Sequence, residues 1–284
     1  MALATSEPDF VANRISTMRK LVFGIVLAAS AAACGISTQQ EVQMGAEYSA
    51  QINAQLPIVQ DAEINRYINV LGDSLARVAD ARGLDYTFYI VNAAEVNAFA
   101  VPGGFIYVNR GLIDRTQNLS QLAGVLGHEI GHVVRRHSVE QMEKAQGANL
   151  GLMLGCTLIN VCGSQAANAA IQIGGTALFA KFSRDDERES DRDAVATLVR
   201  AGINPNGIPQ MFQILLNERN NNSAAVAGWF STHPGEEDRI QETTALVQQV
   251  DPAIMRTLTT NTTSYNTFKA RVRSLPAPST ASSR

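Results

Sequence analysis

Hydrophobic positions in the first part of the chain recur at helical spacing. Between residues 62 and 81 an apolar side chain returns every three or four positions, giving a stripe of Ile64, Tyr67, Ile68, Leu71, Leu75 and Val78. This spacing places the apolar side chains on one face of a helix. We therefore predict an amphipathic helix here, and residues 41–55 are compatible with another helix.

Residues that favour β-structure gather after this helix. Residues 86–91 read Tyr-Thr-Phe-Tyr-Ile-Val, follow the break at Gly83 and predict a strand. Two further short runs, residues 98–101 and 105–108, flank Pro102-Gly103-Gly104, whose residue types favour a turn. We therefore predict a hairpin within a small sheet of about three strands.

The second half of the chain predicts longer helices. Residues 119–146 form one helical pattern, with Asn118 or Ser120 as its N-cap. Residues 147–180 are apolar, rich in glycine and almost free of charge. Glycine and polar residues interrupt this stretch before it reaches the length of a membrane span, so we predict a helical hairpin close to the functional site.

A further helix is predicted over residues 182–201, because Gly202 supplies a typical helix stop. Residues 207–216 fit a shorter helix. Residues 271–284 are rich in Pro, Ser and Ala and predict a disordered tail. Since we find no internal repeat and no linker between domains, residues 35–270 are expected to form one domain.

The N-terminus has the pattern of a targeting segment. Basic residues at positions 19–20 precede an apolar stretch, residues 21–33, which is too short to span a bilayer as a mature helix. Small residues lead directly to Cys34 and resemble the lipobox of bacterial lipoproteins, in which that cysteine is lipidated. An ordinary secretory signal is the alternative. We expect residues 1–34 to be a leader, with translation starting at Met18 and the mature protein lipid-anchored in the periplasm, at the outer rather than the inner membrane.

Charge and cysteine content narrow the possible functions. The chain of 284 residues holds 23 Lys and Arg against 26 Asp and Glu, a net charge of −3, and no segment concentrates basic residues. This pattern argues against a nucleic-acid partner. Besides Cys34, only Cys156 and Cys162 remain. Export would allow a disulfide between them, and two buried thiols are the alternative.

The sequence His128-Glu129-Ile130-Gly131-His132 has the spacing of a metal site. On a helix, residues four apart lie about 6 Å apart along the axis and about 40° apart in rotation, so both imidazoles face one way. Two such rings suit a tetrahedral zinc, and Glu129 projects beside them, where it can take a proton from water. A helix with two incidental histidines is the alternative, but the flanking residues are uncharged, as expected of a buried catalytic helix.

A catalytic zinc needs a third protein ligand. His137 is only five residues beyond His132 and is expected to be rotated off the face of the helix. An acidic ligand from a later helix is therefore expected, and residues 183–191 offer several candidates. Glu187 and Asp191 are four apart, so Glu187 can bind zinc while Asp191 holds a ring N–H of a ligand histidine, most simply His128. A solvated, charged helix face is the alternative for this run.

Taken together, these pieces resemble a known family of zinc metallopeptidases, which includes HtpX, BepA, LoiP and the CAAX prenyl proteases. The matching pieces extend from residue 41 to residue 247 in order. They are Asn97-Ala98-Phe99, Pro102-Gly103-Gly104, Gly111-Leu112, the motif at 128–132, Ser183-Arg184-x-x-Glu187-x-Glu189-x-Asp191, and His233-Pro234 followed by Arg239-Ile240. The absence of a tetratricopeptide tail and of clear transmembrane helices favours the soluble, LoiP-like lipoproteins.

The resemblance implies a fold and a set of roles. It implies an α+β, mostly helical, gluzincin-like domain with one zinc per chain, held by His128, His132 and Glu187. It places His233 near the metal, as an oxyanion stabiliser or as an occupant of the fourth position. It also implies that a strand edge, with Asn97, Ala98, Phe99 and Ala100, pairs with the substrate backbone. Arg239 would orient the substrate chain or a carboxylate.

The expected function is that of a zinc-dependent endopeptidase of the bacterial cell envelope, with Glu129 as general base. By the family resemblance, its partners are misfolded or misassembled envelope polypeptides. A non-catalytic, metal-binding lipoprotein that acts as a chaperone or assembly factor is the alternative. A metal-dependent hydrolase for another substrate class is a third possibility, against which the predicted substrate hairpin argues.

Overall fold

A computed structural model describes three parts of the chain: residues 35–145, 181–221 and 223–278. Residues 38–284 form a unit separate from residues 1–37, and the description below concerns this unit. Several expectations lie outside the described residues: the leader with Cys34, the hairpin at 147–180, and the pairing of Cys156 with Cys162.

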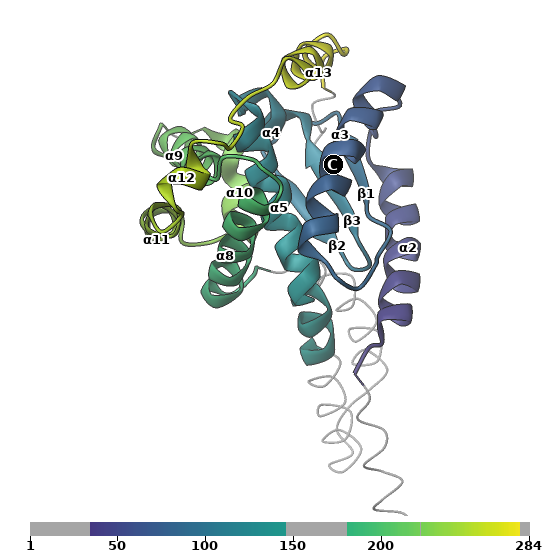
Figure 1. Ribbon diagram of the computed structural model, residues 1–284. Coiled ribbons are helices and arrows are strands. Elements are labelled where there is room, and N and C mark those ends of the chain that lie inside the picture. Colours follow the sequence, from purple (N-terminus) through teal and green to yellow (C-terminus); the bar gives the residue numbers. More distant parts are fainter. Residues whose placement is uncertain (1–34, 146–180, 222, 279–284) are drawn as a thin grey trace, which may run out of the picture. The chain divides into compact units, whose positions relative to one another are not determined.

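A mixed sheet of three strands forms within the described residues, as the sequence predicted. Its strands are β1 (Thr87–Val91), β2 (Ala98–Val101) and β3 (Phe105–Asn109), in the order β1-β3-β2. β2 and β3 are antiparallel and flank the predicted turn, whereas β1 runs parallel to β3. This order puts β2 at one edge of the sheet, beside the helices of the site (Figure 1).

The two faces of the sheet have different coverings. Alternate residues along each strand point to opposite faces. One face packs on the helices α3 (Ala62–Ala79) and α5 (Leu119–Arg135) and carries small and aliphatic side chains with one phenylalanine. Its residues are Phe88, Ile90, Ala98, Ala100, Ile106 and Val108. On the other face the rings of Tyr89 and Phe99 each stack on Tyr107, with centroids 4.9 Å apart. Helix α2 (Thr38–Gln55) covers part of this face, since Ser49 Oγ lies 2.8 Å from the Tyr107 hydroxyl.

Helix α3 (Ala62–Ala79) follows the predicted apolar stripe and begins at the N-cap Asp61. It is joined to β1 by side-chain and steric contacts. The amide of Asn69 donates to the carbonyl of Phe88 and its oxygen accepts from the Phe88 N–H, at 3.0 and 2.9 Å. One turn further on, Gly72 leaves room for the Phe88 ring, because a methyl group at this position would lie 2.3 Å from it.

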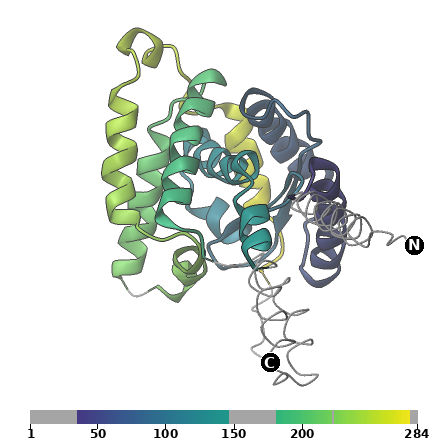
Figure 2. The same ribbon diagram turned by 90° about the horizontal axis from the view of Figure 1, so that it is seen from below.

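Helix α5 (Leu119–Arg135) lies between the sheet and the later helices, and residues 119–133 are all buried. Its N-cap is Asn118, one of the two predicted residues, whose side chain accepts from the Gln121 N–H. On the side away from the sheet lie α8 (Arg184–Arg200), α9 (Gly207–Asn220) and α11 (Glu236–Gln248), as Figure 2 shows in green tones. Shorter described elements are α4 (Arg110–Arg115), η1 (Ala224–Val226), α10 (Ala227–Thr232), α12 (Pro252–Met255) and α13 (Thr263–Arg273).

The mostly helical α+β class is confirmed, but some predicted boundaries are wrong. The helix predicted over 119–146 ends at Arg135, because Arg136 adopts a left-handed conformation with φ of 61°. Helix then resumes over residues 137–145. Helix α9 continues four residues beyond its predicted end, and α13 ends at Arg273. Within the described residues, no helix has both the length and the apolar character needed to cross a membrane.

The contact between α3 and β1 gives a stability prediction. Replacing Gly72→Ala inserts a methyl group into the Phe88 ring, and overpacking of this kind costs about 1–3 kcal/mol of unfolding free energy. Val70→Ala is the control on the same helix, because Val70 is 61% exposed and its truncation should change stability by less than about 0.5 kcal/mol. Urea unfolding of both variants measures the difference. Equal midpoints for the two variants would contradict the packing described.

Candidate metal centre

Close packing of α5 on α8 brings the chemistry-bearing side chains together. Glycines on α5 face α8, where a methyl group at Gly131 would lie 3.0 Å from Ser190 Cα and one at Gly127 would lie 3.5 Å from Ala194 Cα. The two backbones can approach closely because these positions carry no side chain. As a result, carboxylates on α8 reach the histidines on α5.

Hydrogen bonds in its first turn fix the residue at which helix α8 begins. Ser183 Oγ accepts from the Asp186 N–H and the Asp186 carboxylate accepts from the Ser183 N–H, which together form a capping box. Glu187 and Asp191 then follow at a spacing of four residues. Both side chains point into the molecule, with exposures of 0% and 2%.

Four side chains place a ligand atom in one small, buried cluster: His128, His132, Glu187 and His233. The Nε2 atoms of His128 and His132 are 3.0 Å apart, and each lies 3.4 Å from an oxygen of Glu187. His233 Nδ1 lies 3.4 Å from His128 Nε2 and 3.0 Å from Glu187 Oε1. All four candidate ligand atoms lie within 4.8 Å of one another.

These distances fit a tetrahedral metal. Bonds of about 2.0–2.1 Å place the donors of a tetrahedron about 3.3 Å apart, close to the separations found here. Imidazole nitrogens with one carboxylate form the donor set of many catalytic zinc sites. The cluster therefore fits zinc in its spacing and in its chemistry.

A second layer of groups orients the two imidazoles of α5. Asp191 Oδ1 lies 2.9 Å from His128 Nδ1, the ring nitrogen that faces away from the cluster. Arg239 holds Asp191 in turn, through Nε and Nη2 at 2.7 and 2.8 Å. On the other ring, His132 Nδ1 lies 2.9 Å from Nδ1 of His137, which is also buried. Contacts of this kind fix the tautomer and the direction of a ligand ring.

The charged groups of the centre shift one another's pKa values in both directions. Burial opposes ionisation of Glu187, yet the charges of His233, Arg239 and His128 outweigh it and hold its pKa well below the usual value. Burial and the charge of Arg239 both disfavour a protonated His128, but Glu187 and Asp191 raise the pKa of its ring to about 9. Glu187 is thus held as a carboxylate, the form in which it can serve as a metal ligand.

Glu129 lies beside the cluster and lacks hydrogen-bond donors within the described part of the chain. Both of its carboxylate oxygens are buried and accept no hydrogen bond there, and Oε1 is 3.6 Å from His233 Nε2. Burial raises the pKa of this carboxyl group. A buried carboxylate without donors is costly to maintain, and it suits a group whose partner is water or substrate.

Aromatic rings lie against the histidines of the cluster. The sequence motifs did not predict the contacts of Phe182 and Trp229 with these rings. Phe182 stacks on His132 with centroids 3.9 Å apart, and Trp229 stacks on His233 at 4.5 Å. The Arg239 guanidinium lies 4.2 Å from the centroid of the Phe212 ring. Phe182 and Phe212 are far from residues 128–132 in sequence, so only the tertiary structure brings them to the cluster, whereas Trp229 lies four residues before His233.

Of the residues expected to bind substrate, Ala98, Phe99 and Ala100 lie on β2 and Asn97 directly precedes it, whereas Arg239 lies on α11 and pairs with Glu187 and Asp191. The N–H of Asn109 donates to the carbonyl of Asn97, which sets the alternation of the antiparallel ladder. From this alternation, the backbone groups of Ala98 and Ala100 point away from β3, towards the outer edge of the sheet. No described strand pairs with that edge. Asn97 Oδ1 is buried and accepts no hydrogen bond from the described residues.

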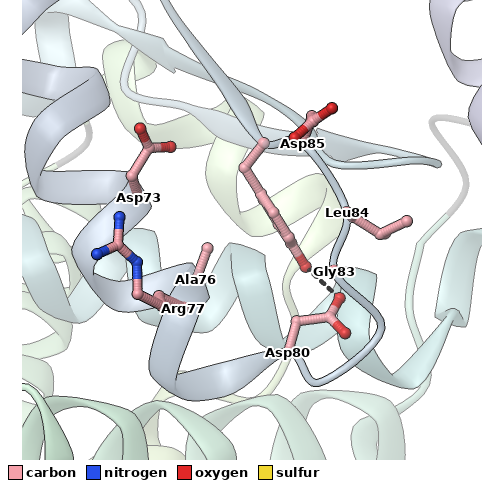
Figure 3. A pocket seen from close by; sticks show the side chains of 8 residues that line it. Asp73, Ala76, Arg77, Asp80, Gly83, Leu84 and Asp85 are labelled. Atoms are coloured by element: carbon pink, nitrogen blue, oxygen red, sulfur yellow. Dashed lines mark hydrogen bonds between the residues drawn. The ribbon is translucent and has the colours of Figure 1, made fainter.

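A separate hollow of about 400 Å³ lies beside the loop between α3 and β1 (Figure 3). Asp73, Asp80 and Asp85 line it together with Arg77, and none of the four candidate metal ligands does. Asp80 already has partners, since it accepts from Arg82 and from the Tyr86 hydroxyl at 2.8 Å. We therefore assign no ligand to this hollow.

Comparison with known proteins identifies the family that carries this arrangement. Residues 62–247 match peptidase family M48. The chain belongs to this family. Its members use zinc, in agreement with the donor cluster, and the family resemblance drawn from the motifs is confirmed.

Several metalloproteases of Escherichia coli (strain K12) are similar to this chain. The beta-barrel assembly-enhancing protease is 33% identical over 227 residues, which cover 78% of this chain and 46% of that protein. Metalloprotease YcaL is 32% identical over 60% of this chain and 67% of its own length. Metalloprotease LoiP, the relative that the motifs favoured, is 26% identical over 64% of this chain and 69% of its own length. The chain thus spans less than half the length of the first of these relatives.

The contact between His132 and His137 gives a prediction for metal affinity. For His132 to offer Nε2 to zinc, its Nδ1 must carry the ring proton, which His137 Nδ1 can accept. His137→Ala removes this acceptor and should weaken zinc binding by about 10–100-fold, the usual effect of losing such a partner. His137→Asn is the matched variant, because its Oδ1 can occupy nearly the same position and should restore most of the affinity. Competition with a chelator measures the zinc affinity of both variants. Equal affinities for wild type and His137→Ala would refute the role of this contact.

Proposed function

We propose that this protein is a zinc-dependent endopeptidase. The metal would be held by His128, His132 and Glu187. The observation that carries the proposal is the buried donor cluster on α5 and α8 with the carboxylate of Glu129 beside it. Membership of peptidase family M48 supports the same reaction class.

The side chains around the cluster would divide the work of peptide hydrolysis. Zinc bound there would polarise the scissile carbonyl and lower the pKa of water in the open position. Glu129 takes a proton from the attacking water and returns it to the leaving amine. Asp191 and Arg239 act together, because Arg239 holds the carboxylate that orients the His128 ring.

We infer that the substrate backbone pairs with the outer edge of β2. An extended peptide can add a strand to the unpaired edge of a sheet, with main-chain hydrogen bonds supplying much of the affinity. Ala98 and Ala100 are buried, so the peptide would have to displace the groups that cover them. Ala98 and Ala100 would supply those bonds, while Asn97 and Phe99 would contact the peptide. In support, β2 packs against α5, the helix that carries the catalytic motif.

We further propose that the protein works in the bacterial envelope, as a lipoprotein of the periplasm anchored through Cys34 at the outer membrane. Its substrates would be misfolded or misassembled envelope proteins. Two observations support this: the lipobox-like residues before Cys34, and the similarity to a beta-barrel assembly-enhancing protease. Residues 35–270 would supply the peptidase domain.

Glu129→Gln tests the proposed mechanism. The amide keeps the shape of the side chain but cannot take up the proton, so turnover of casein should fall by about 10²–10⁴-fold while bound zinc is retained. Glu140→Gln is the control, because this side chain is 53% exposed and lies outside the cluster. Casein cleavage and zinc content are measured on the same preparations. If Glu129→Gln cleaves at the wild-type rate, the role of Glu129 as general base is wrong.

We infer that His233 occupies the fourth donor position in the resting protein. Its Nδ1 faces both His128 and Glu187, and the ring is completely buried beneath Trp229. In this arrangement the ring competes with water and substrate for the position they need. Movement of α10, at whose C-cap His233 lies, would release it.

Replacing His233→Ala should therefore raise basal casein cleavage several-fold with zinc still bound, because the competing donor is gone. Thr232→Ala is the matched control, since this hydroxyl contacts only carbonyls of α10 in the described structure. Initial rates and zinc content are compared for the three proteins. A loss of turnover specific to His233→Ala would instead assign the ring to transition-state stabilisation.

A further inference from the structure

Helix α2 packs on the rest of the unit through an unusual set of side chains. Its buried residues are Glu41, Gly45 and Ser49, spaced four apart on one face, and none of them is apolar beyond a glycine. Helices in this position are more often held by an apolar stripe. α2 also lies before residues 62–247, which are the part that matches the family. Its fully buried contacts therefore consist of polar groups and a close backbone approach, beside the partly buried Met44, Tyr48 and Ile52.

Glu41 is the centre of those polar contacts. Its side chain has an exposure of 0%, and Oε2 lies 2.8 Å from Arg136 Nε and 3.4 Å from Arg82 Nη1. Oε1 accepts from the backbone N–H of Gly103 at 3.3 Å. Gly103 belongs to the turn between β2 and β3 and has φ of 81°, a conformation that favours glycine. One buried carboxylate thus contacts the turn of the hairpin and two arginines.

Gly45 brings the backbone of α2 against the same turn. A methyl group at this position would lie 1.9 Å from the carbonyl oxygen of Pro102. Backbone atoms cannot move aside as a flexible side chain can. The position of residues 102–104 is therefore set by α2 through a charge at Glu41 and through direct contact at Gly45.

The arginines connect this carboxylate to the end of the catalytic helix. Arg82 Nη2 donates to the carbonyl of Val133 at 2.8 Å, one residue after His132. Arg136 ends α5 in the left-handed conformation, which is uncommon for a residue with a side chain, and its side chain points to Glu41. Glu41, Arg136 and His132 also line one small cavity together with Ala100 and Val101 of β2.

We propose that Glu41 is a positioning residue for the substrate strand. Through Gly103 and the two arginines, Glu41 fixes the β2–β3 turn relative to the C-terminal end of α5, and so aligns the edge of β2 with the metal centre. The proposal rests on the proposed function in one respect, that β2 is the strand that binds substrate. It assigns a part in substrate alignment to a helix that lies outside the family match.

Glu41→Gln tests this role, since it keeps the volume of the side chain and removes its charge. Arg82 keeps Asp80 and the Val133 carbonyl as partners, so the variant is expected to fold. Amide hydrogen exchange should become faster in residues 98–104, where the turn loses its fixed partner. For a peptide long enough to pair with β2, KM should rise about tenfold while kcat changes little, because alignment rather than chemistry is affected. Zinc affinity should equal that of wild type.

Gly45→Ala supplies a second, independent disturbance, because it pushes the turn by steric contact and leaves Glu41 in place. It should reproduce the faster exchange in residues 98–104 and the higher KM. Ser49→Ala is the matched control: it removes the hydrogen bond between α2 and Tyr107 on the same helix face without touching the turn. This control should leave both exchange and KM at wild-type values.

Two results would overturn the proposal. The first is unchanged exchange in residues 98–104 of Glu41→Gln; the second is an equal effect in Ser49→Ala, which would mean a general loosening of α2. The exchange measurement needs no turnover, so it separates this inference from the proposed function. If wild type failed to cleave peptides while exchange still responded to Glu41→Gln, the peptidase assignment and not the contact would be at fault.

Discussion

The structure depends above all on burying three carboxylates in one place. Glu129, Glu187 and Asp191 have exposures of 0–2%, and isolated charges of this kind are very costly away from water. Two conditions make the arrangement possible. Positive charge must be close at hand, which Arg239 supplies directly to Glu187 and Asp191. The helices must also approach closely enough for the carboxylates to meet the imidazoles, which requires residues without side chains, such as Gly131, on α5.

Much of the fold could be predicted because it rests on local patterns. The apolar stripe of α3, the β-forming run of β1 and the turn at 102–104 are readable from neighbours in sequence. The break in α5 was not readable, because a periodic pattern continues through Arg136. Its left-handed backbone is favoured by tertiary contacts, among them the one with Glu41, 95 residues away. The helices after residue 223 were missed for a similar reason, since several of them are short and weakly amphipathic.

In the candidate site, too, local patterns predicted some features, and tertiary contacts determine the others. The spacing of four residues correctly placed His128 beside His132, and Glu187 beside Asp191, since helical geometry alone decides these pairs. His137 lies outside the donor cluster, as expected, but its contact with His132 was missed because the rule assumed that the helix continues. Once Arg136 turns the chain, His137 returns to His132 Nδ1. The contact of Phe182 with the His132 ring crosses 50 residues of sequence, and no local pattern could have predicted it. Trp229 lies only four residues before His233, but its place against the metal centre depends on the packing of α10.

Arg136 therefore has two consequences that cannot be separated. Its backbone conformation brings His137 against one candidate metal ligand, and its side chain pairs with the carboxylate that holds the β2–β3 turn. Arg136, at the end of α5, is thus linked both to the surroundings of the metal site and, through Glu41, to the turn that positions β2. Loss of the left-handed turn would disturb the orientation of the His132 ring and the position of the hairpin together. For this reason the precision of the metal centre and that of the strand edge are coupled in this fold, although they lie on different secondary-structure elements.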